Sequence, residues 1–182
     1  MNYESRDQIE EKYRWDLSSM YESDEAFEQA LVDLKTYPEQ LASYRGKILQ
    51  SASELLAYLR LEDHVTLEFE KAWNYAERRS DEDTRVSKYQ AYTARCMSLY
   101  TQLEEAGSWF NAELLSISED TIAGFYADEP ALEHYRRKLE QILRMRAHTL
   151  SAAEEALLAR ANDAASQPAN VYSMFEDADL TF

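Results

Sequence analysis

The sequence has few residues that turn a chain sharply, with only three glycines and three prolines among 182 residues. Hairpin turns depend on such residues, so a sheet built from hairpins is disfavoured. Ala, Leu, Glu and Arg, which favour helices, are by contrast frequent. We therefore predict an all-α fold, a single domain of long antiparallel helices with no sheet. The length suits one such domain or one lobe of a larger protein.

Cysteine and long apolar runs are also scarce. The single cysteine, Cys96, excludes an internal disulfide, and its place in a helical pattern indicates a small apolar core residue rather than a reactive thiol. No apolar run approaches the ~20 residues that span a bilayer, and the charged N-terminus lacks the apolar segment of a secretion signal. We predict a cytoplasmic protein with no membrane partner.

Basic residues are in the minority, because 19 Lys and Arg face 35 Asp and Glu, for a formal net charge of −16. This charge opposes a phosphate backbone, so nucleic acid is excluded as a partner. Two interpretations of the charge stay open. It could solvate exposed helix faces, or it could form an acidic wall that attracts cationic peptides.

Catalytic and metal-binding motifs are missing. His64, His134 and His148 lie far apart, and none belongs to an H-E-x-x-H motif or follows a glutamate by three residues. Phosphate loops, dinucleotide-binding glycine motifs and nucleophile elbows are absent. Two acidic clusters, 81–83 and 177–179, lack the glycine and the final glutamate of a calcium loop. We assign no catalytic, metal or cofactor-binding residue, and the substrate-binding residues are unknown.

Helix signals begin in the first 50 residues. A short charged helix is predicted at 5–13, and the apolar residues of 14–21 are expected to make 1–22 an anchor segment. Ser23 is an N-cap residue, so a helix should begin near Asp24. The Tyr37-Pro38 pair should interrupt this helix, because the residue before a proline avoids the α region, and Gly46 should end it.

Two long helices are expected next. Ser51 and Glu54 form a capping box, and the apolar stripe that follows pauses at the polar residues 62–64. The stripe then resumes, either in the same helix or in a neighbour after a kink. The acidic cluster 80–84 is interpreted as the cap of a second helix of about 25 residues that runs to Gly107.

Shorter helices should complete the fold. We predict helices at 114–117 and 118–126, and a further helix that Pro130 starts and that runs through Arg146, since proline suits the first helical turn. Residues 139–159 then predict a turn and a second helix, which the capping residues Ser151 and Glu154 open and which reaches about Ala165. The 13 tyrosines suit either helix packing at a wet boundary or a peptide-lining surface.

Five ordered blocks resemble the oligoendopeptidase F family of thimet-oligopeptidase-like zinc metallopeptidases. These blocks are residues 14–21 with 23–27, 81–84, 89–90, 139–159 and 177–182. One departure is Ala112, which stands before Glu113-Leu114 where the family often has proline. This departure changes the start of a helix and not the family assignment.

The resemblance implies that residues 1–182 are an N-terminal helical lobe, truncated at the boundary to a catalytic domain that carries the H-E-x-x-H helix. In the family such a lobe covers the catalytic cleft and admits oligopeptides but not folded proteins. Its implied partners are the catalytic domain of the same polypeptide and oligopeptide substrates. The implied parent protein is a zinc metalloendopeptidase, whereas this chain alone holds no cofactor and hydrolyses nothing.

A different class of function remains open beside this one. A stand-alone helical adaptor could bind partner helices or peptides through a tyrosine-rich face, provided that the natural gene ends near Phe182. A metal-carboxylate bundle is disfavoured, because the E-x-x-H spacing is absent.

Overall fold

The computed structural model describes residues 8–149 and Pro168. The chain divides into two units, residues 1–139 and 140–182, and each is described by itself. In the described residues every regular element is a helix, which confirms the all-α prediction. None of these helices combines the length and the apolarity needed to cross a membrane. The assignment of 1–182 to one lobe stays a prediction.

The N-terminal segment is only partly helical. Within residues 8–13 the predicted α-helix is replaced by 3₁₀ conformation at Gln8 and in the short helix η2 (Glu11–Tyr13), since this charged stretch has no apolar stripe to bury. Tyr21 is the buried residue of the segment, and its ring lies 5.7 Å from that of Phe27 and 5.3 Å from that of Tyr75. Trp15, in contrast, is 51% exposed.

The first two α-helices are α1 (Asp24–Leu34) and α2 (Tyr37–Ala42). The predicted start is confirmed, because Ser23 Oγ accepts a 3.3 Å hydrogen bond from the backbone N–H of Ala26. Pro38 lies in the first turn of α2, where its missing N–H costs no helical hydrogen bond.

The predicted end of α2 at Gly46 is wrong by four residues. The helix ends at Ala42, and the Gln40 carbonyl accepts hydrogen bonds from both the hydroxyl (2.7 Å) and the backbone N–H (3.2 Å) of Ser43. The chain then continues through turns to Gly46, whose φ of +77° suits glycine.

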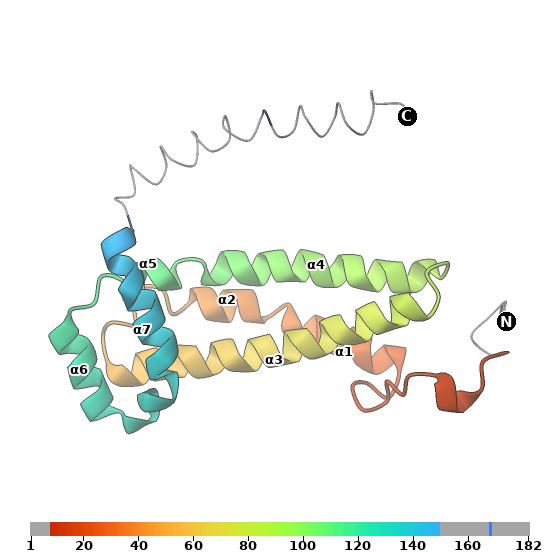
Figure 1. Cartoon of the computed structure of the whole chain (residues 1–182), viewed down its shortest axis with the longest axis horizontal. Helices are drawn as coiled ribbons and strands as arrows, with labels where there is room; N and C mark the ends of the chain where they lie inside the picture. Colours follow the sequence, from red (N-terminus) through yellow and green to blue (C-terminus); the bar gives the residue numbers. More distant parts are fainter. Residues whose placement is uncertain (1–7, 150–167, 169–182) are drawn as a thin grey trace. The chain divides into compact units, whose positions relative to one another are not determined.

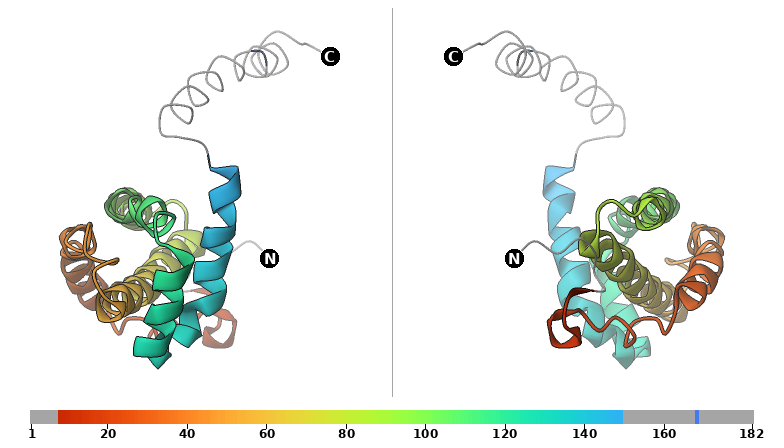
Figure 2. Two further views of the ribbon diagram at one scale, coloured as in Figure 1. Left: turned by 90° about the vertical axis from the view of Figure 1, so that its left-hand side faces the viewer. Right: turned by 90° about the vertical axis from the view of Figure 1, so that its right-hand side faces the viewer.

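Two long helices form the frame of the first unit. Helix α3 (Ala52–Glu82) is one continuous helix, so the polar interval at 62–64 causes no break. Helix α4 (Ser87–Gly107) packs along it in the opposite direction (Figure 1). Helix α1 packs against α3, and α2 packs against both α3 and α4. Figure 2 views the long helices nearly end-on.

The acidic cluster at 80–84 does not cap α4 as predicted. It forms the last turn of α3 and the linker that follows. The Asp83 carboxylate accepts hydrogen bonds of 3.0 and 2.8 Å from the backbone N–H and Nε of Arg85, which holds the linker in a turn. Val86 precedes α4 without a side-chain cap.

The core of the first unit lies where α1, α3 and α4 meet. The Phe27 ring is fully buried and lies 5.1 Å from the Tyr75 ring and 4.5 Å from the Tyr92 ring. Cys96 is buried on the same face of α4, which confirms its interpretation as a core residue. Such aromatic contacts add to the free energy gained by burying the rings.

Shorter helices follow α4. They are α5 (Phe110–Leu114), α6 (Glu119–Asp128), the 3₁₀ helix η3 (Pro130–Tyr135) and α7 (Arg136–Arg144). The α-helix predicted from Pro130 therefore begins only at Arg136. Residues three apart share a face of a 3₁₀ helix, and in η3 this places Leu132 and Tyr135 together in the core.

The second unit is described over residues 140–149 and Pro168. The described part contains the end of α7 and the 3₁₀ helix η4 (Met145–His148). The basic residues Arg144 and Arg146 lie in the last turns of α7 and η4, where positive charge suits a helix C-terminus. The predicted helix from Ser151 lies outside the described residues.

Candidate functional site

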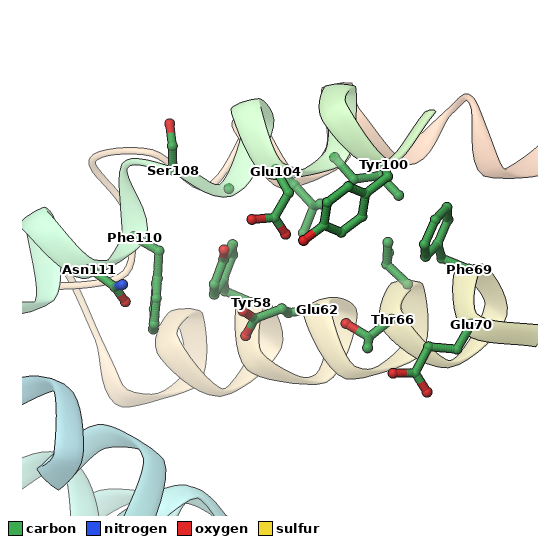
Figure 3. A pocket seen from close by; sticks show the side chains of 14 residues that line it. Tyr58, Glu62, Thr66, Phe69, Glu70, Tyr100, Glu104, Ser108, Phe110 and Asn111 are labelled. Atoms are coloured by element: carbon green, nitrogen blue, oxygen red, sulfur yellow. The ribbon is translucent and has the colours of Figure 1, made fainter. Parts of the chain in front are cut away.

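A groove with a volume of about 470 Å³ lies between α3 and α4 and continues to the start of α5 (Figure 3). One wall comes from α3 and the other from α4, and Leu41 of α2 also lines the groove. The lining residues are Leu41, Tyr58, Glu62, Val65, Thr66, Phe69, Glu70, Tyr100, Leu103, Glu104, Gly107, Ser108, Phe110 and Asn111.

Helical periodicity places these side chains in the groove. Residues three and four apart share one face of an α-helix, so Glu62 and Thr66 follow one another along α3. Tyr100 and Glu104 do the same on α4, and Figure 3 shows both side chains extending toward α3. The Phe69 and Tyr100 rings lie 5.6 Å apart across the groove.

The groove has an apolar floor and an acidic rim. Val65, Leu103 and Phe110 are buried beneath it. Glu62 forms an ion pair with Lys138. Within the described part of the chain, neither the Glu70 nor the Glu104 carboxylate is paired with a Lys or Arg side chain.

Tyr58 lines the groove and is almost fully buried. Burial raises the pKa of its phenol, and the nearby Glu62 and Glu104 carboxylates raise it further. The phenol is therefore protonated at neutral pH and cannot serve as an anionic nucleophile. A Cβ at Gly107 would lie 3.5 Å from the Tyr58 hydroxyl, so the Tyr58 side chain reaches from α3 to the last turn of α4.

A second polar cluster lies at the other end of α3, around Asp24. Its carboxylate accepts hydrogen bonds of 2.7 Å from Tyr75 Oη, 2.7 Å from Lys88 Nζ and 3.2 Å from Tyr89 Oη. Arg79 Nη2 lies 3.5 Å from the same carboxylate. These contacts tie α1, α3 and α4 together.

The electrostatics of this cluster favour the charged carboxylate. Burial alone would raise the pKa of Asp24, but hydrogen bonds from Lys88 and Tyr75 and the charge of Arg79 outweigh burial and lower the pKa. The Asp24 carboxylate, the Lys88 ammonium, the Arg79 guanidinium and both phenols each contact another member of the cluster, so we assign the cluster to stability rather than to chemistry.

The residue types that usually carry catalysis are dispersed. His64 Nε2 lies 2.9 Å from Tyr37 Oη, and the His134 ring lies against Tyr135. Burial raises the pKa of the Cys96 thiol to about 11, so it is a poor nucleophile. In residues 8–149 and Pro168, no three His, Cys, Asp or Glu side chains gather closely enough to hold a metal ion.

The sequence left open whether the tyrosines pack between helices or line a surface that binds peptides. Most of those on the long helices are core residues, among them Tyr58, Tyr75 and Tyr92. Tyr100 is 44% exposed and belongs to the groove wall. Sequence reasoning did not find the groove, because no local signal pairs Phe69 and Glu70 with Tyr100 and Glu104. The acidic cluster at 177–179 lies outside the described residues.

Comparison with known proteins gives consistent similarities. Residues 113–182 match the protein family described as Oligopeptidase F. The group B oligopeptidase PepB of Streptococcus agalactiae is 33% identical over 98% of this chain and 30% of its own length. The chain thus spans about a third or less of the relatives it matches.

Solved structures agree with these sequence relatives. The crystal structure of oligoendopeptidase-F from Enterococcus faecium is 36% identical, with a TM-score of 0.62 over 88% of this chain and 32% of its own. A Chlamydophila abortus protein described as a peptidase is 26% identical, with a TM-score of 0.86 over 98% of this chain and 30% of its own.

Proposed function

We propose, because the chain belongs to the oligoendopeptidase F family and corresponds to its N-terminal part, that it covers the catalytic cleft of a zinc-dependent oligoendopeptidase. We propose that this cover restricts the cleft to oligopeptides. The observation that carries the proposal is the similarity over 98% of this chain to a relative of which it spans only 30%. We propose the cytoplasm as its location.

The chemistry of the described residues supports a role without catalysis. Zinc in peptidases is held by His and carboxylate ligands on a closely spaced motif, and the described side chains do not fit such a site. The zinc ligands and the catalytic base would therefore belong to the rest of the longer polypeptide. Zinc would supply Lewis-acid activation of the scissile carbonyl and of water there.

The role of a cover is supported by the rigidity of the first unit. Helices α3 and α4 are long, continuous and joined to α1 through the Asp24 cluster. A rigid helical cover limits a cleft by excluding folded domains while a flexible oligopeptide can thread beneath it. Without the cover, the size of the substrate would no longer limit hydrolysis.

Hydrolysis of quenched-fluorescence peptides of increasing length tests the proposal. We expect no hydrolysis by the 182-residue chain alone. A longer polypeptide that contains the chain should cleave short peptides and lose rate steeply as the substrates lengthen. Removal of zinc with a chelator should abolish this cleavage and leave the helical circular dichroism of the 182-residue chain unchanged.

Two results would contradict the proposal. One is zinc-dependent cleavage by the 182-residue chain itself. The other is a longer polypeptide that cleaves a folded protein and a short peptide at similar rates.

A further inference from the structure

We infer that the groove between α3 and α4 binds a cationic stretch of an oligopeptide, with one large apolar side chain on its floor and Lys or Arg side chains at its rim. This inference rests on the proposed function, because it names a substrate class for the same protein. It adds a preference of the protein for peptides with positive charge and a large apolar side chain, which restriction by peptide size alone does not give.

The floor of the groove suits a large apolar side chain. Its volume of about 470 Å³ lies within the range of about 300 to 1,000 Å³ that is usual for ligand sites. Val65, Leu103 and Phe110 provide an apolar base. Tyr100, which is 44% exposed, leaves part of its ring uncovered beside Phe69. An apolar side chain that enters here would remove this surface from water.

The rim of the groove suits positive charge. Glu104 extends from α4 toward α3, whereas the Glu70 carboxylate is directed away from α4 (Figure 3). Both residues line the groove, one from each helix. In the described residues both lack the cationic partner that Lys138 gives to Glu62. A guanidinium or ammonium group at the rim would neutralise them and could also lie against the Tyr100 ring.

The same charges disfavour a second copy of the chain as the occupant. The formal net charge of −16 makes two copies repel one another. An anionic or neutral peptide would leave Glu70 and Glu104 without partners or would be repelled by them. Charge complementarity therefore selects a cationic segment.

Fluorescence anisotropy with labelled octapeptides tests the inference. One probe is alanine-based and carries a Phe with an Arg two residues away on each side. In a second probe both Arg residues are Glu, and in a third the Phe is Ala. We expect the 182-residue chain to bind the first probe at least about tenfold more tightly than the second. Added salt should reduce this ratio.

Substitutions in the rim assign the binding to the groove. The double substitution Glu70→Gln with Glu104→Gln should weaken binding of the cationic probe about three- to tenfold. Glu105→Gln is the matched control, since Glu105 is the exposed neighbour of Glu104 on α4 and lies outside the groove. Glu104→Lys should reverse the preference toward the Glu probe, which a loss of folding would not do.

Three outcomes would overturn the inference. They are equal binding of the Arg and Glu probes, equal effects of the double substitution and of Glu105→Gln on binding, and self-association by sedimentation that Glu104→Lys abolishes. Binding by the 182-residue chain that is lost in the longer polypeptide would overturn it too, because another part of that polypeptide would then fill the groove.

The tests separate this inference from the proposed function. Length-limited hydrolysis by the longer polypeptide without charge-selective binding would overturn the inference alone. Charge-selective binding without hydrolysis by the longer polypeptide would overturn the proposed function alone.

Discussion

The Tyr75 hydroxyl donates a 2.7 Å hydrogen bond to the Asp24 carboxylate and thereby joins α3 to the first turn of α1. The two residues lie 51 positions apart in the chain. Both are mostly shielded from water, so the bond links two helices where solvent competes little.

Tyr75→Phe should lower the free energy of unfolding by about 1.5 to 3 kcal/mol, because it removes a hydrogen bond to a charged acceptor and keeps the ring. Urea unfolding followed by circular dichroism measures the change. Tyr13→Phe is the control, since Tyr13 is 69% exposed, and it should alter stability by less than about 0.5 kcal/mol. Equal effects of the two substitutions would contradict the role of the Tyr75 bond.

Asp24 should make stability depend on pH in the acid range. Its pKa in the folded protein is lowered from 3.8, because hydrogen bonds from Lys88 and Tyr75 outweigh burial. A lowered folded-state pKa contributes stability that is complete above the unfolded value and is lost as pH falls through the folded value.

The comparison of Asp24→Asn with the unsubstituted chain isolates this contribution. At about pH 7 the substitution should cost about 1 to 3 kcal/mol, and the difference should shrink as pH falls below about 4. Urea unfolding at several pH values measures it. A difference that stays constant down to about pH 2 would contradict the assignment of the charge to Asp24.

Leu59 and Leu67 on α3 form a matched pair that tests which face of the helix is buried. Leu59 is fully buried, and Leu67 is 64% exposed. Leu59→Ala should cost about 2 to 5 kcal/mol through lost burial and a cavity. Leu67→Ala should change stability by less than about 0.5 kcal/mol. The reverse order in urea unfolding would mean that α3 is rotated about its axis.

Two glycines should respond to alanine in opposite directions. Gly124 lies inside α6, and a Cβ there meets no atom within 4 Å. Gly124→Ala should therefore raise stability by about 0.5 to 1 kcal/mol. Gly46 has a φ of +77°, so Gly46→Ala should lower stability by about 1 kcal/mol or more. Thermal unfolding of both variants checks the two signs.

Local signals predicted the starts of three helices, whereas the starts of α4 and α7 differ from the prediction. Ser23, Ser51 and Ser118 each accept a hydrogen bond from a backbone N–H two or three residues into the following helix, as an N-cap residue does. The information for such a cap lies within one turn of the chain. The sequence could therefore place the first turns of α1, α3 and α6.

Tertiary packing decided the features that sequence reasoning missed. The cluster at 80–84 has the composition of a cap, yet α3 continues through most of it because Arg79 pairs with Asp24 and Glu82. The groove depends on which residues of α3 and α4 face one another, and residues such as Phe69 and Tyr100 lie far apart in sequence. Periodicity gives each helix its buried face but not the partner of that face.

The intact mass of the native protein in its source cells tests the central claim most directly. The chain covers 30% of the Streptococcus agalactiae relative, so we predict a mass roughly three times that of these 182 residues, with an H-E-x-x-H motif in the additional sequence. A native mass equal to that of the 182 residues alone would contradict the role of a cleft cover and favour the stand-alone adaptor.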